Sequence, residues 1–144
     1  MNERPVRLAV IVLALVHLTL GVLGFFFLPE NNQTGANTLW IFSATGILDL
    51  IRAGTGVGGL VAVLKPAAMA VYGWFVFLAF AGLTAFGVLS SATNTAGDAV
   101  NVGWADNILH ALTSLAAFGI AAAVMRRGGR ARPGQPAHGE RSGA

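Results

Sequence analysis

The chain has 144 residues, of which 55% are hydrophobic and only 10% are charged, and its mean hydropathy is +0.68. This composition excludes an ordinary soluble domain, and the length favours a single domain. The absence of cysteine excludes disulfides, thiol catalysis, iron–sulfur clusters and thiolate metal sites. Five of the nine Lys/Arg residues lie within the last nineteen, so the net charge of +3 indicates anionic lipid headgroups rather than nucleic acid as a partner.

A first membrane span is predicted over residues 8–28, which carry no formal charge and are long enough to cross a hydrocarbon core of ~30 Å. The alternative is a cleaved signal peptide. Its hydrophobic region would be ~7–15 residues long, whereas this apolar run continues through Phe25, Phe26 and Phe27. We therefore expect a retained span, followed by a loop at 29–37 without Lys or Arg.

The second predicted span, 46–64, contains Asp49 and Arg52. Its nine Leu, Ile and Val residues contribute about 4 kcal/mol toward insertion, whereas the two ionisable residues oppose it by about 6 kcal/mol. This helix therefore needs its neighbours to remain in the membrane. A G-x-G-x-x-G pattern at 54–59 lies within the span and follows no strand, so it predicts close helix packing rather than nucleotide binding.

Two further spans are predicted over 67–89 and 105–125, separated by a loop without positive charge. The expected fold is an all-α polytopic membrane four-helix bundle formed by residues 1–127. A basic tail over 128–144, rich in Gly, Pro and Arg, is expected to be disordered because it has almost nothing to bury.

The basic residues predict the orientation. In a four-span topology every Lys and Arg except Arg52 falls on one side, whereas the loops on the other side contain none. By the positive-inside rule both termini are cytoplasmic, and the chain is a multi-pass protein of the cell membrane, in a bacterium the inner membrane.

Six polar residues within or beside these spans are candidates for a ligand or proton site, because an ionisable group in a span is costly unless it is paired or hydrated. A structural role is the alternative for each. Asp and Arg three residues apart can pair on one helix, an Asp in a first turn can cap it, and a His can hydrogen-bond across the bundle. The candidates are Asp49, Arg52, Asp106, Asn107, His110 and His17.

Cofactors and catalytic residues are not expected. His17 and His110 are the two histidines within the spans, and their predicted depths differ by several ångströms, which disfavours a shared haem. A zinc site needs three or four ligands, and the available His and Asp residues are spread over three helices. No catalytic triad or nucleotide-binding loop is recognisable.

Three segments carry a resemblance to a known family: GVLGFFFLP at 21–29, DLIRAGTGVGGL at 49–60 and ADNILHAL at 105–112. The chain resembles, over roughly residues 7–126, a family of small bacterial four-helix membrane proteins known as a domain of unknown function. The resemblance implies four helices with an Asn-x-x-His element in helices two and four. Asn107 and His110 fit that element, whereas helix two has Asp49 and Arg52 in its place. No activity is implied.

The expected function is that of a non-enzymatic accessory or structural membrane component. Four residues would lock the second helix to the fourth: Asp49, Arg52, Asn107 and His110. The expected partners are membrane lipids, with anionic headgroups at the basic tail, and a second copy or another membrane protein. One alternative is a small transporter or proton-coupled carrier that binds an anionic group at Arg52. A further alternative is a membrane redox or lipid-modifying enzyme.

Overall fold

The structure, a computed structural model, describes residues 3–26, 38–93 and 102–130. The predicted all-α fold class is confirmed, with four helices in the described residues: α1 (Arg4–Phe26), α2 (Gly46–Ala62), α3 (Pro66–Thr93) and α4 (Trp104–Arg130). Two short strands, which were not anticipated, pair as an antiparallel hairpin directly before α2: β1 (Thr38–Leu39) and β2 (Phe42–Ser43).

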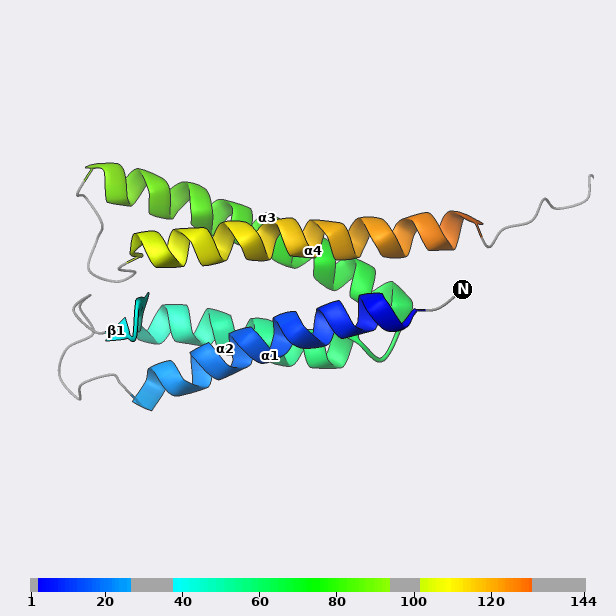
Figure 1. The fold of residues 1–144 in the computed structure, drawn as a ribbon, viewed down its shortest axis with the longest axis horizontal. Helices are drawn as coiled ribbons and strands as arrows, with labels where there is room; N and C mark the ends of the chain where they lie inside the picture. The colour runs from blue at the N-terminus through cyan, green and yellow to red at the C-terminus, as the bar shows by residue number, and fades with distance from the viewer. Residues whose placement is uncertain (1–2, 27–37, 94–101, 131–144) are drawn as a thin grey trace, which may run out of the picture.

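Three helices are long and apolar enough to cross a membrane: α1, α3 and Trp104–Gly128 of α4. The chain is therefore a membrane protein. Helix α2 has 17 residues, about 26 Å at ~1.5 Å per residue, which is shorter than a bilayer core of ~30 Å. The β1–β2 hairpin lies at the N-terminal end of this short helix (Figure 1).

Two helices extend further at their C-terminal ends than the sequence predicted. Helix α3 continues to Thr93, into the predicted loop, and α4 continues to Arg130, so residues 128–130 of the predicted disordered tail are helical. The rest of that tail lies outside the described residues, as do the 29–37 loop and residues 94–101.

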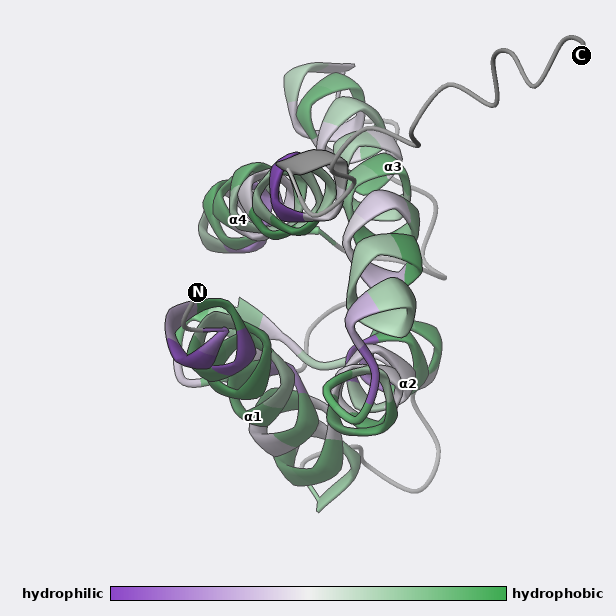
Figure 2. Cartoon of the chain, turned by 90° about the vertical axis from the view of Figure 1, so that its right-hand side faces the viewer, coloured by the Kyte–Doolittle hydropathy of each residue, from purple (hydrophilic) through white to green (hydrophobic). Residues whose placement is uncertain are grey.

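The helices form two hairpin pairs, in which α1 packs mainly on α2 and α3 mainly on α4 (Figure 1). The α2–α3 turn is closed by backbone hydrogen bonds from Val63 N to Gly59 O and from Lys65 N to Ala62 O. Pro66 begins α3, a position where its missing N–H costs no helical hydrogen bond. Viewed end-on, the helices follow an arc from α1 through α2 and α3 to α4 (Figure 2).

Glycines allow α1 and α2 to approach closely, as the sequence predicted for the 54–59 pattern. A Cβ at Gly56 would lie 2.5 Å from Leu18 Cβ and 2.7 Å from the carbonyl oxygen of Ala14. A Cβ at Gly59 would lie 2.7 Å from Ala14 Cβ. Side chains at these positions would push the helices apart, so the glycines set the α1–α2 distance.

Helices α3 and α4 are joined by a similar close approach. A Cβ at Gly73 would lie 2.9 Å from the carbonyl oxygen of Ala117. Nearby, Ser114 Oγ donates a hydrogen bond to the carbonyl oxygen of Phe77 at 3.0 Å. The buried Ser114 side chain therefore faces α3 rather than lipid.

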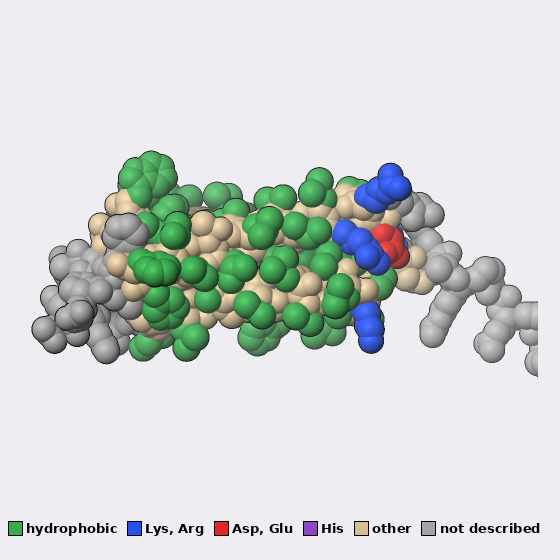
Figure 3. All heavy atoms as spheres, turned by 90° about the horizontal axis from the view of Figure 1, so that it is seen from below, with side chains coloured by type: hydrophobic (Ala, Val, Ile, Leu, Met, Phe, Trp, Pro, Cys, Tyr) green, Lys and Arg blue, Asp and Glu red, His purple; other side chains and the backbone are tan. Residues whose placement is uncertain are grey.

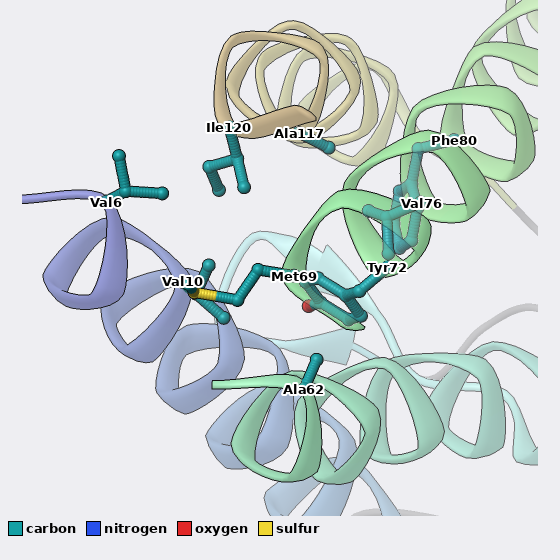
Figure 4. Packing of buried hydrophobic residues seen from close by; sticks show 9 residues of the cluster. All are labelled: Val6, Val10, Ala62, Met69, Tyr72, Val76, Phe80, Ala117 and Ile120. Atoms are coloured by element: carbon teal, nitrogen blue, oxygen red, sulfur yellow. The ribbon is translucent and has the colours of Figure 1, made fainter. Parts of the chain in front are cut away.

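A buried apolar cluster lies where the two pairs meet, with side chains from all four helices (Figure 4). Its members are Val6, Val10, Ala62, Met69, Tyr72, Val76, Phe80, Ala117 and Ile120. On the face that Figure 3 shows, apolar side chains cover the middle of the molecule, whereas the Lys, Arg and acidic side chains visible there gather at one end. This distribution is that of a protein whose middle faces hydrocarbon.

A matched pair of alanine substitutions tests the α1–α2 packing. We expect Gly56→Ala to lower the free energy of unfolding by about 1–3 kcal/mol, because the added methyl group overlaps Leu18 and the Ala14 carbonyl. Gly54→Ala is the control, since a Cβ there meets no atom within 4 Å. Thermal unfolding in detergent measures both, and equal stability of the two variants would contradict the packing role.

Candidate functional site

Arg52 is the centre of a buried charged cluster, and its side chain is only 1% exposed. Its Nη1 donates to the backbone carbonyl oxygen of Ser43 at 2.7 Å and to Asp49 Oδ1 at 3.3 Å. Its Nη2 donates to Asp106 Oδ1. One guanidinium therefore connects α2 both to β2 and to α4.

Besides pairing with Arg52, Asp106 at the start of α4 accepts hydrogen bonds from two backbone N–H groups. Its Oδ2 accepts a hydrogen bond from the backbone N–H of Gly103 at 3.1 Å, which is the reach-back of a capping box from the third helical position. The same oxygen accepts from the backbone N–H of Ser43 at 3.0 Å. Its capping contact was expected from the sequence, whereas its ion pair with Arg52 was not.

The strand hairpin places the Ser43 backbone between these two charged side chains. Trp40, in the turn between β1 and β2, has a φ of 59°, in the left-handed region that a non-glycine residue adopts only at a cost. After Ser43, the Thr45 hydroxyl accepts a hydrogen bond from Leu48 N at 3.3 Å and caps α2. The turn and the cap together fix the chain on both sides of Ser43.

The cluster carries two carboxylates and one guanidinium in a place that solvent does not reach, since Asp49 and Asp106 are both 0% exposed. Charges buried in this way are tolerated only with close partners, and removing one partner leaves the other uncompensated. Gly24 of α1 packs directly against the Asp49 carboxylate, where a Cβ would overlap it. Helix α1 thus helps to enclose this carboxylate.

Asn107 and His110 lie outside this network, although the sequence placed both in the lock between the second and fourth helices. Asn107 Nδ2 donates to Ser91 Oγ on α3 at 3.3 Å. His110 is 0% exposed, and neither ring nitrogen has a hydrogen-bond partner among the described residues. The lock seen in the structure is formed instead by Arg52 with Asp106.

His17 of α1 is hydrogen-bonded at both ring nitrogens. Nδ1 lies 3.1 Å from the carbonyl oxygen of Leu13, which can only accept, so Nδ1 donates. In the neutral ring Nε2 therefore accepts a hydrogen bond from the Thr113 hydroxyl at 3.3 Å. Sequence reasoning missed Thr113, but its spacing from His110 and Asp106 continues one polar stripe along α4.

The Phe80 ring contacts both imidazoles edge-to-face, with centroid distances of 5.0 Å to His17 and 5.3 Å to His110. A haem ligated by both histidines would need the space in which this ring packs. Within residues 3–26, 38–93 and 102–130, no three His, Asp or Glu side chains are grouped so that they could hold a metal ion. The Phe80 ring thus packs against both imidazoles in the interior.

Comparison with protein families decides the relationship of this chain. The family described as Domain of unknown function (DUF4383) matches residues 7–123, which include every residue of the charged cluster. The chain belongs to this family. Comparison with curated proteins and with solved structures found no match. The DUF4383 match assigns no activity.

Single and double substitutions test whether Arg52 and Asp106 depend on each other. We expect Asp106→Asn to lower the free energy of unfolding by about 3–5 kcal/mol, because it leaves a buried guanidinium without its main counter-charge. Arg52→Met should cost a similar amount, and the double variant should cost clearly less than the sum.

The control for this cycle is Glu3→Gln. It breaks an ion pair with Arg7 in which both side chains are more than 40% exposed, and it should cost less than about 1 kcal/mol. Chemical denaturation in a mild detergent measures all four variants. Strict additivity of the Arg52 and Asp106 effects would show that the two side chains stabilise the fold independently.

Proposed function

We propose that this DUF4383 protein is a non-enzymatic accessory or structural component of its membrane, and that its charged cluster holds the fold together. The supporting observation is the enclosure of Arg52. Its two Nη atoms are bonded to three groups of the same chain, and 1% of the residue is exposed. An anionic ligand would have to displace the protein's own carboxylates, which makes a binding role unfavourable.

The proposed location is the cell membrane of a bacterium, with both termini in the cytoplasm. The distribution of basic side chains supports this orientation. The start of α1, the α2–α3 turn and the end of α4 carry these side chains, and all three lie at the same end of the molecule (Figure 1). Anionic headgroups are the partners that this basic end would meet. A second copy or another membrane protein would meet the lipid-facing helices.

We also propose that Asp49 and Arg52 replace an Asn-x-x-His element that other family members have in the second helix. The support is positional: Asp49 and Arg52 have the same spacing as Asn107 and His110 in α4. An Arg in place of a neutral His needs a carboxylate partner, and in this chain Asp106 supplies it.

Cysteine labelling tests the orientation, and the native chain contributes no background because it has no cysteine. Lys65→Cys lies in the exposed α2–α3 turn, and Trp40→Cys lies in the β1–β2 turn, where Trp40 is 81% exposed. We expect a membrane-impermeant maleimide to label Trp40→Cys in intact cells and Lys65→Cys only after lysis. The reverse pattern would place the termini outside.

A second candidate function is proton-coupled transport, and a specific observation favours it. Six buried polar atoms lack a hydrogen-bond partner in the described residues: Asp49 Oδ2, Arg52 Nε, Ser90 Oγ, Asn107 Oδ1 and both ring nitrogens of His110. An unpaired buried polar group costs about 1–3 kcal/mol unless water or a ligand satisfies it. Such groups are expected along a proton path.

His110→Leu separates the two functions. Under the structural proposal the variant should be at least as stable as the wild type, because two unpartnered polar atoms are removed from the interior, and reconstituted liposomes should show the same low proton flux for both proteins. A pH-sensitive dye inside the liposomes measures the flux, and thermal unfolding measures stability. Proton flux in the wild type that disappears in a well-folded His110→Leu variant would establish the carrier instead.

A further inference from the structure

Residues of α1 and α4 line a long groove. These two helices are the ends of the arc that Figure 2 shows. Its volume is about 760 Å³, within the range of sites that bind small molecules. It exists because α1 packs mainly on α2 and α4 mainly on α3, so these two helices touch each other only in part. In the membrane this groove faces lipid.

The surface of the groove is suited to hydrocarbon. Leu8, Val12 and Leu112 line it and are each more than half exposed. Only His17 and Thr113 bring side-chain polar atoms to its wall, and these are hydrogen-bonded to each other at 3.3 Å. With no unpaired polar atom to satisfy, the groove favours an apolar chain over a polar ligand.

The length of the groove corresponds to one leaflet. Along α1 it extends from Pro5 to His17, about 18 Å at ~1.5 Å per residue, compared with ~15 Å for half of the hydrocarbon core. Beyond His17, toward Phe42, lies a separate and smaller hollow of about 400 Å³. A partner helix would cross both leaflets, so the large part of the groove fits an acyl chain better.

The basic end of the groove has a different chemistry. It adjoins a second hollow of about 670 Å³, which shares Val6 with the groove and is lined by Glu3, Arg127 and apolar residues such as Met69. Arg127 is thus positioned where a lipid whose chain lies in the groove would place its headgroup. A guanidinium favours a phosphate by charge and by hydrogen bonding.

We infer that the groove between α1 and α4 binds one anionic phospholipid of the leaflet at the basic end. One acyl chain lies along Leu8, Val12 and Leu112, and the phosphate lies beside Arg127. This inference goes beyond the proposed function, since the charged cluster around Arg52 takes no part in it and a structural role for that cluster would stand without it.

Two glycines provide a matched test of the acyl-chain site. Gly119 lines the groove and Gly82 lies on the outer face of α3, and a Cβ at either position meets no atom within 4 Å. Gly119→Leu should fill the groove and reduce the bound lipid about tenfold, whereas Gly82→Leu should leave it unchanged. Ala116→Leu fills the same groove and replaces Gly119→Leu if that variant does not fold.

Two neighbouring arginines provide the test of the headgroup site. Arg127 lines the basic hollow, whereas Arg126 does not. Arg127→Gln should reduce retention of phosphatidylglycerol about fivefold, the effect of one well-placed basic residue near an anionic lipid. Arg126→Gln makes the same change in net charge and should have little effect.

The measurement is native mass spectrometry of protein delipidated in detergent and then incubated with phosphatidylglycerol or phosphatidylcholine. We expect one phosphatidylglycerol per wild-type chain and about fivefold less phosphatidylcholine. Equal retention of the two lipids, or equal effects of Gly119→Leu and Gly82→Leu, would overturn the inference. A dimer in the wild type that Gly119→Leu converts to a monomer without a change in bound lipid would assign the groove to a second copy instead.

Discussion

The ion pair between Arg52 and Asp106 is the interaction on which the arrangement of the helices depends. Helix α2 is short and carries two ionisable residues, so its transfer into hydrocarbon by itself is unfavourable. Asp49 on the same helix supplies one carboxylate to Arg52, whereas the second, that of Asp106, comes from α4, 54 residues away along the chain. Insertion of α2 is therefore coupled to its assembly with the other hairpin pair, because the Asp106 carboxylate reaches the guanidinium only in the assembled protein.

Close packing makes this coupling feasible. The α1–α2 pair approaches through Gly56 and Gly59, and the α3–α4 pair through Gly73, so each pair is stabilised by backbone proximity. Between the pairs the contacts are fewer, and they include the apolar cluster around Phe80, the ion pair, and the hydrogen bond from Thr113 to His17. Strong packing within pairs and limited packing between them leaves the side between α1 and α4 open, which is why a groove lies there.

The charged cluster around Arg52 and the groove between α1 and α4 have opposite properties. The charged cluster contains three ionisable side chains but is buried, and its hydrogen bonds are made to the protein's own backbone and carboxylates. The groove is lined almost entirely by apolar residues but is open to the membrane, and it ends beside the basic residue Arg127. This protein exposes little polar surface within the membrane. Another molecule would therefore bind more favourably in the apolar groove than at the buried ion pair, whose partners it would have to displace.

The sequence by itself determined the all-α class, the glycine-based packing of α2 and the capping role of Asp106, because apolar length, small-residue spacing and first-turn carboxylates act locally. Only the tertiary structure shows the long-range partners: Asp106 as the second carboxylate beside Arg52, the Ser43 backbone between them, and Thr113 for His17. These choices depend on the rotation and depth of each helix relative to the others and on a strand hairpin too short to leave a pattern. The rotation and depth of a helix follow from its packing, to which residues far apart in the chain contribute together.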